Sequence, residues 1–125
     1  MCVAQYCVAM AEDFGEADLL ATHVQELRRG TVVLACLSML TEPRYGYALL
    51  ETLKLGGLAV DGNTLYPLLR RLEKQGLLVS EWNTDEPRPR KFYRTTPQGQ
   101  AFRDRLLTEW HDLGTAIETF ARRTS

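Results

Sequence analysis

Hydrogen-bonding and cationic side chains gather in two stretches of the chain. Residues 61–75, DGNTLYPLLRRLEKQ, place two amides, two hydroxyls and three cations within one short segment. Residues 83–91, NTDEPRPRK, add three more cations around two prolines. Amide and guanidinium groups can make paired hydrogen bonds to base edges, and Arg and Lys side chains pair with phosphates. These side chains could therefore contact a nucleic acid.

The first stretch is predicted to form a helix with two contrasting faces. If the helix begins near Asn63 or Thr64, either residue can cap its free amides, and Gly76 ends it. Four leucines then recur at i, i+3, i+4 and i+7 and form an apolar stripe: Leu65, Leu68, Leu69 and Leu72. The opposite face carries Tyr66, Arg70, Arg71 and Lys74. Taken alone, this pattern also fits an ordinary surface helix.

The second stretch is predicted to lie at the tip of a β-hairpin. After Gly76 the apolar period changes from 3.6 to 2 over residues 77–82, which is typical of a strand. Residues 83–89 are rich in turn formers, and the alternation resumes over residues 90–95. The tip would present Arg88, Arg90 and Lys91, while Tyr93 would pack within the hairpin.

Three helices are predicted before the basic one. Residues 16–29 form an amphipathic helix, and Thr31 caps an apolar run over residues 32–40 that is typical of a buried central helix. A further helix spans residues 45–55, with Tyr47 near its start. This order of two helices, a basic helix and a hairpin is that of a winged helix-turn-helix. In such a module a helix enters the major groove of DNA and the hairpin follows the adjacent minor groove or the DNA backbone. Some winged helices bind proteins instead of DNA, and this alternative remains open.

The last helix carries a long apolar seam. Thr96 is its predicted cap and Pro97 its first residue. Large apolar residues then recur at steps of 4, 4, 3, 4 and 3: Phe102, Leu106, Trp110, Leu113, Ile117 and Phe120. Two interpretations fit this seam, namely pairing with a second copy of the chain or folding back onto the same domain.

Four blocks together resemble the PadR-type transcriptional regulators. They are LRRGTVVLACLSML at residues 27–40, YGYALL at 45–50, GNTLYPLLRRLEKQGLL at 62–78 and PRKFYRTTPQG at 89–99. The chain departs from the family pattern at Tyr45, where His is common, and at Ala48, where an acidic residue is frequent. The acidic leader before Glu26 is not part of the shared core.

The resemblance implies a mainly α fold with a small β-hairpin, in which a winged helix-turn-helix is followed by one C-terminal dimerisation helix. This is the organisation of the compact subgroup. It also implies a DNA-binding homodimer, usually a repressor, and two-fold pairing predicts an inverted-repeat operator with recognition helices roughly 34 Å apart. The expected domains are a disordered leader at residues 1–15, the DNA-binding domain at 16–95 and the dimerisation helix at 96–125.

Residue roles follow from the two basic stretches and the seam. The expected DNA-binding residues are Tyr47, Asn63, Thr64, Tyr66, Arg70, Arg71, Lys74, Arg88, Arg90 and Lys91. The expected dimer contacts are the six seam residues. In some compact relatives the resemblance implies an effector pocket at the dimer interface, which here would use Trp110, Phe102 and Leu106 and would take a hydrophobic or aromatic compound. Trp110 could equally serve only to fill the seam.

Composition narrows the remaining possibilities. The 125 residues carry a net charge of −1, but residues 1–26 hold five acidic and no basic side chains, so residues 27–125 carry +4. Cys2, Cys7 and Cys36 form no metal-ligand pattern, and no phosphate loop or catalytic triad is recognisable, so we expect no metal, no cofactor and no enzymatic activity. No signal peptide or membrane-spanning segment is evident, which predicts a cytoplasmic protein whose start is either Met1 or Met10.

Overall fold

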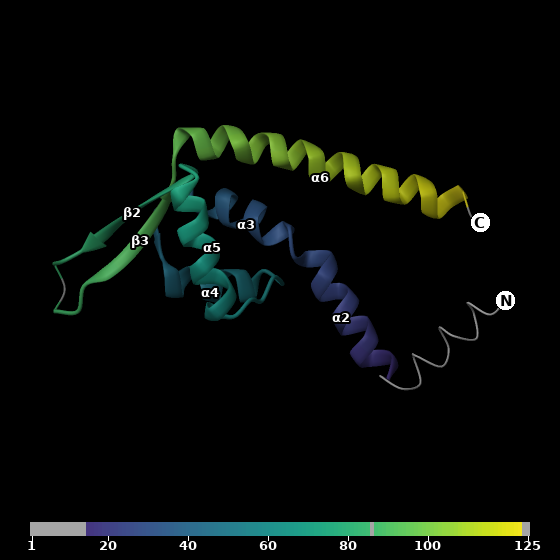
Figure 1. The fold of residues 1–125 in the computed structure, drawn as a ribbon, viewed down its shortest axis with the longest axis horizontal. Helices are drawn as coiled ribbons and strands as arrows, with labels where there is room; N and C mark the ends of the chain where they lie inside the picture. The colour runs from purple at the N-terminus through teal and green to yellow at the C-terminus, as the bar shows by residue number, and fades with distance from the viewer. Residues whose placement is uncertain (1–14, 86, 124–125) are drawn as a thin grey trace. The chain divides into compact units, whose positions relative to one another are not determined.

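The computed structural model describes residues 15–85 and 87–123. Its helices and strands, in chain order, are α2 (Glu16–Arg28), α3 (Thr31–Met39), β1 (Arg44–Tyr45), α4 (Gly46–Leu55), α5 (Gly62–Lys74), β2 (Leu78–Asn83), β3 (Arg90–Thr95) and α6 (Pro97–Arg123) (Figure 1). The mainly helical fold class with a small β element is confirmed. The predictions for residues 1–14, which include Cys2, Cys7 and Met10, lie outside the described residues.

The chain divides into two units, residues 1–31 and residues 32–125. In the first unit α2 forms as the periodicity predicts, but it contains no buried residue, and Leu20 and Leu27 are exposed. The predicted capping role of Thr31 is wrong. Thr31 is the first residue of α3 rather than the residue before it, and its hydroxyl donates to the carbonyl of Arg28 at 2.6 Å.

The core of the second unit lies among three short helices and one end of the sheet. Helices α3, α4 and α5 contribute most of its side chains, as their apolar stripes predict. The buried hydrophobic residues are Val32, Cys36, Leu37, Leu40, Leu49, Leu53, Leu65, Leu69, Leu72, Leu77, Leu78 and Tyr93. Tyr93 is thus a packing residue, as expected. Because α5 supplies three of these leucines, its apolar stripe holds its other face outward.

The sheet has three antiparallel strands in the order β1-β3-β2. The hairpin strands pair from Leu78 opposite Thr95 to Asn83 opposite Arg90, and the hairpin extends away from helices α3, α4 and α5 (Figure 1). The prediction of a two-stranded sheet with a helix starting at Tyr45 is corrected here. Tyr45 pairs with Phe92 in β1, and α4 begins one residue later. A strand of two residues is too short to leave a periodic signal in the sequence.

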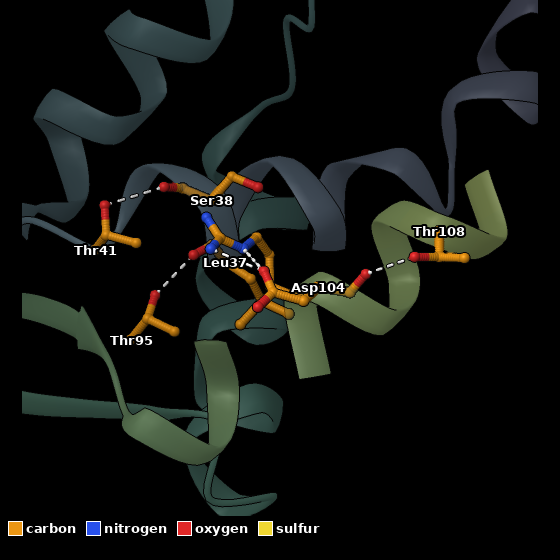
Figure 2. Close-up of polar contacts among 7 residues, drawn as sticks. Leu37, Ser38, Thr41, Thr95, Asp104 and Thr108 are labelled. Atoms are coloured by element: carbon orange, nitrogen blue, oxygen red, sulfur yellow. Dashed lines mark hydrogen bonds and ion pairs between the residues drawn. The ribbon is translucent and has the colours of Figure 1, made fainter. Parts of the chain in front are cut away.

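Two threonines join the end of the hairpin to the helices on either side of it. The Thr95 hydroxyl donates to the carbonyl of Leu37 at 2.9 Å, which ties β3 to α3 (Figure 2). The Thr96 hydroxyl accepts from the amide of Gly99 at 2.9 Å, so the predicted cap of α6 is confirmed. These bonds fix the point at which α6 leaves the sheet.

Candidate nucleic-acid interface

Helix α5 begins at a different cap from the one predicted. The carboxylate of Asp61 accepts from the amide of Thr64 at 2.9 Å, and the helix starts at Gly62. The prediction that Asn63 or Thr64 is the cap is therefore wrong, because Asp61 stands two residues before Asn63 and is an equally good acceptor. Gly76 adopts φ +80° just after the helix, as its predicted role as a stop requires. Asn63 and Thr64 instead lie exposed in the first turn.

The outer face of α5 is polar, and its cations are accessible. Arg70, Arg71 and Lys74 are exposed, whereas Leu68 of the predicted stripe is only partly buried. Since Leu65, Leu69 and Leu72 are buried on the other side, the cations cannot rotate inward without removing the core. The helix thus presents a fixed row of hydrogen-bond donors to the outside.

Tyr66 differs from its neighbours on the predicted polar face, because its ring is half-buried between α4 and the start of α5. A Cβ atom added at Gly46 would lie 2.6 Å from the Tyr66 ring, and one at Gly62 would lie 3.0 Å from it. The two glycines therefore leave the space that the ring occupies. Tyr66 sets the spacing of these two helices, and a direct DNA contact from it stays a prediction.

Arg90 of the hairpin lies against the beginning of α4. Its Nη1 donates to the hydroxyl of Tyr47 at 2.7 Å, and its Cζ lies 5.1 Å from the centre of the Tyr47 ring. Both residues are exposed, Tyr47 at 51%. The structure thus brings together two residues that the sequence assigned to DNA from segments 43 positions apart.

Lys91, the next residue along β3, lies in a different environment. Its ammonium is 3.6 Å from a carboxylate oxygen of Glu73 in α5, and the side chains of both residues are about one-third exposed. Glu73 also accepts a hydrogen bond from the hydroxyl of Ser80 in β2. This group connects the hairpin to α5. Because Glu73 offsets its charge, Lys91 is a weaker candidate for a phosphate contact than its position in the sequence implies.

The ring of Tyr93 lies beneath these charges. Burial raises the pKa of its hydroxyl above the usual value, and the negative charge of Glu73 raises it further, while the positive charge of Arg70 opposes the shift. Arg70 is therefore close enough to β3 to act on it electrostatically.

An open pocket of about 240 Å³ lies where the hairpin meets α4 and α5. It is lined by Tyr45, Gly46, Tyr47, Tyr66, Trp82, Arg90, Lys91 and Tyr93. Trp82 is 62% exposed and was not assigned a role from the sequence. The signal that could have identified it is an indole on the outer side of a strand next to a turn. Aromatic walls with two cations can accommodate a sugar and phosphate of a nucleic-acid backbone.

The apolar seam of α6 remains uncovered in the single chain. Leu106 packs against the core, whereas Phe102, Trp110, Leu113, Ile117 and Phe120 are between 44% and 64% exposed. The interpretation in which this helix folds back onto its own domain is therefore wrong for the described residues. The ring of Trp110 meets the ring of His111 edge-on at 5.1 Å.

Cys36 is the free cysteine among the described residues, and it lies in the core. Cys36 is fully buried, and burial raises the pKa of its thiol to about 12, so the reactive thiolate does not form near neutral pH. Among the described residues, no three His, Cys, Asp or Glu side chains are grouped so that they could hold a metal ion. No described helix has both the length and the apolar character that crossing a membrane requires.

Residues 33–105 match the model of the transcriptional regulator PadR-like family. The chain is 40% identical over 79 residues to the transcriptional regulator Rv3488 of Mycobacterium tuberculosis. The aligned residues cover 62% of this chain and 74% of that protein. Among solved structures, a PadR family transcriptional regulator from Eggerthella lenta is 47% identical, with a TM-score of 0.81 over 89% of this chain and 96% of that one. A transcriptional regulator from Clostridium thermocellum is 30% identical, with a TM-score of 0.71 over 76% and 97%.

Proposed function

The chain belongs to the PadR-like family of transcriptional regulators, which are not enzymes, and from that premise we propose that it binds double-stranded DNA sequence-specifically as a homodimer. Residues 16–95 form the DNA-binding part and residues 96–125 the dimerisation helix. The observation that carries the proposal is that α5 and the hairpin both present exposed cations, which are Arg70, Arg71, Lys74, Arg88 and Arg90. The leucines on the opposite face of α5 are buried, so the cations of this helix are held outward, where a partner can reach them.

Helix α5 is the part that enters the major groove. Asn63, Thr64 and Arg70 are the side chains that reach base edges, since amide and guanidinium groups can pair with adenine and guanine. Arg71 and Lys74 contact phosphates, which position the helix without reading sequence. Tyr47, Arg88 and Arg90 extend these backbone contacts to the flanking DNA, with a smaller contribution from Lys91.

The seam of α6 supplies the two-fold pairing. Exposing five large apolar side chains to water is unfavourable in free energy, and a second copy of the same helix can cover them. A two-fold dimer presents two α5 helices to successive major grooves, roughly 34 Å apart. The operator is therefore an inverted repeat, and the protein acts there as a repressor.

A mobility shift with DNA from upstream of the protein's own gene tests the proposal. We expect Arg70→Ala to weaken binding by about 10- to 100-fold, the range for loss of a paired base contact, and Arg90→Ala to weaken it less. Arg122→Ala is the matched control, because it removes a cation from the last turn of α6, and it should bind like the wild type. A wild-type protein that shifts no DNA would favour the protein-binding alternative.

A hydrophobic or aromatic effector would act on the same dimer. Trp110, Phe102 and Leu106 lie on the seam, where a flat aromatic compound can stack. Such a compound should quench the fluorescence of Trp110 and weaken DNA binding over the same concentration range. If Trp110→Ala retains the full response of DNA binding to the compound, Trp110 only fills the seam.

A further inference from the structure

Four side chains connect the start of α4 to the outermost pair of the hairpin. The amide Nδ2 of Asn83 donates to the hydroxyl of Tyr45 at 2.6 Å, and Nη1 of Arg90 donates to the hydroxyl of Tyr47 at 2.7 Å. Asn83 and Arg90 face each other across β2 and β3. Each strand of the hairpin is thus bonded to its own tyrosine. We name these four residues, Tyr45, Tyr47, Asn83 and Arg90, the wing latch.

The two tyrosines are themselves held in place. Their rings stack 5.8 Å apart with an angle of 11° between the planes, and the Tyr45 ring meets that of Phe92 edge-on at 6.0 Å. Tyr45 also pairs through its backbone with β3. The Arg90 guanidinium lies 5.1 Å from the centre of the Tyr47 ring and 6.0 Å from that of Tyr45. The latch therefore rests on the sheet rather than on a loop.

A hairpin that extends beyond its packed base is flexible, because two strands alone are marginally stable in water. An arginine on such a hairpin loses much rotational freedom when it binds a phosphate, and that entropy lowers the affinity. A side chain already held in its bound direction avoids this loss. The tyrosine ring and hydroxyl that hold Arg90 reduce its freedom before DNA arrives.

We propose that Tyr45 and Asn83, neither of which is assigned to DNA, are positioning residues that hold the Tyr47–Arg90 pair and the hairpin at the angle required for DNA binding. The inference rests on the proposed DNA-binding function. It separates two roles within the latch. Arg90 contacts the phosphate backbone of the DNA. The hydrogen bond between Tyr45 and Asn83 makes no DNA contact and only restricts the conformational freedom of the Arg90 side chain before binding.

Tyr45→Phe is the central variant, since it removes the hydroxyl that accepts from Asn83 and keeps the stacked ring. Asn83→Ala is second, but it also removes the oxygen that accepts from the amide of Asp85 at the turn. Thr52→Val is the matched control, because it deletes a half-buried hydroxyl of α4 that bonds within its own helix. Circular dichroism and thermal melting establish that all three fold.

Binding to the same operator fragment is measured by fluorescence anisotropy across a range of salt concentrations. Tyr45→Phe should weaken binding by about 3- to 10-fold, the range expected for one hydrogen bond, and leave the salt slope unchanged because no phosphate contact is lost. Arg90→Ala should reduce the salt slope by about 1 per subunit. In an Arg90→Ala background, Tyr45→Phe should lose most of its effect, while Thr52→Val should match the wild type throughout.

The outcomes separate the inference from the function on which it rests. Tyr45→Phe with wild-type affinity, or with the same loss in the Arg90→Ala background, would overturn the positioning role while DNA binding stands. A wild-type protein without DNA affinity would remove the proposed function, and the latch role with it. Faster hydrogen exchange at the amides of β2 and β3 in free Tyr45→Phe would support the inference, and unchanged exchange would contradict it.

Discussion

Arg90 and Lys91 are neighbours in β3, yet their side chains meet different partners. Arg90 lies against Tyr47, while Lys91 pairs with Glu73 of α5. Successive residues of a strand point to opposite faces, so adjacent cations in the sequence need not share an environment. A partly exposed ion pair contributes little to stability, but it does offset the charge of Lys91. Since the Arg90 side chain is exposed and that of Lys91 is only about one-third exposed, we place more of the DNA contact on Arg90.

Gly99 is the glycine at which a side chain would be most disruptive. A Cβ atom there would lie 2.1 Å from the carbonyl oxygen of Leu77 and 2.7 Å from a methyl group of Thr95. Gly99→Ala should therefore lower the free energy of unfolding by about 1–3 kcal/mol, the usual range for an overpacked site. Chemical denaturation followed by circular dichroism measures the change.

Gly114 in the same helix is the control for this substitution. Nothing lies within 4 Å of a Cβ atom added there. Gly114→Ala should raise the stability of the helix by about 0.5–1 kcal/mol, because alanine loses less backbone entropy than glycine. If Gly99→Ala is as stable as Gly114→Ala, the close approach of α6 to the end of the hairpin is not as described.

At the scale of elements, α5 and α6 show how a pattern can identify a helix without identifying its partner. The leucine stripe of α5 is covered by α3, α4 and the sheet within one chain. The seam of α6 has the same kind of periodicity, yet it stays exposed beyond Leu106. Whether the apolar seam of α6 is buried therefore depends on where this helix leaves the sheet. The hydrogen bonds of the Thr95 and Thr96 hydroxyls determine that point.

Leu113→Asp tests whether a second copy covers the seam. Leu113 is 63% exposed in the single chain, so the substitution should leave the monomer folded. A carboxylate at a paired apolar position loses its hydration, and the dimer should dissociate to monomers. Light scattering after size exclusion measures the mass.

Thr115→Asp adds the same charge two residues along, on the opposite side of the helix. It should remain dimeric at concentrations at which Leu113→Asp is monomeric. Equal masses for the two variants, at every concentration, would show that the seam does not form the dimer contact.

At the scale of the whole molecule, the net charge of −1 makes binding depend on where the cations lie rather than on their number. If the dimer neutralises about six phosphates, the logarithm of its binding constant should fall with the logarithm of the salt concentration with a slope near −5. Anisotropy titrations between low and physiological salt measure the slope. A binding constant that does not change with salt would contradict the phosphate assignment.

The sequence alone determined the elements and which of their faces are apolar. Leucine spacing defined α5, a change of period defined the hairpin, and Thr96 with Pro97 defined the start of α6. These are signals between residues close in the chain, where local geometry and hydrogen bonding fix the outcome. The winged helix order and the family resemblance followed from the same blocks.

Only the tertiary structure decided which distant side chains meet. The two-residue strand β1, the Tyr66 ring between two glycines, the ion pair of Lys91 with Glu73 and the wing latch all join segments that are far apart in sequence. No periodicity encodes such contacts, because they depend on how α4, α5 and the hairpin pack against one another. The basic residues were visible from the beginning, but the structure decided which of their side chains are exposed and which are partly buried.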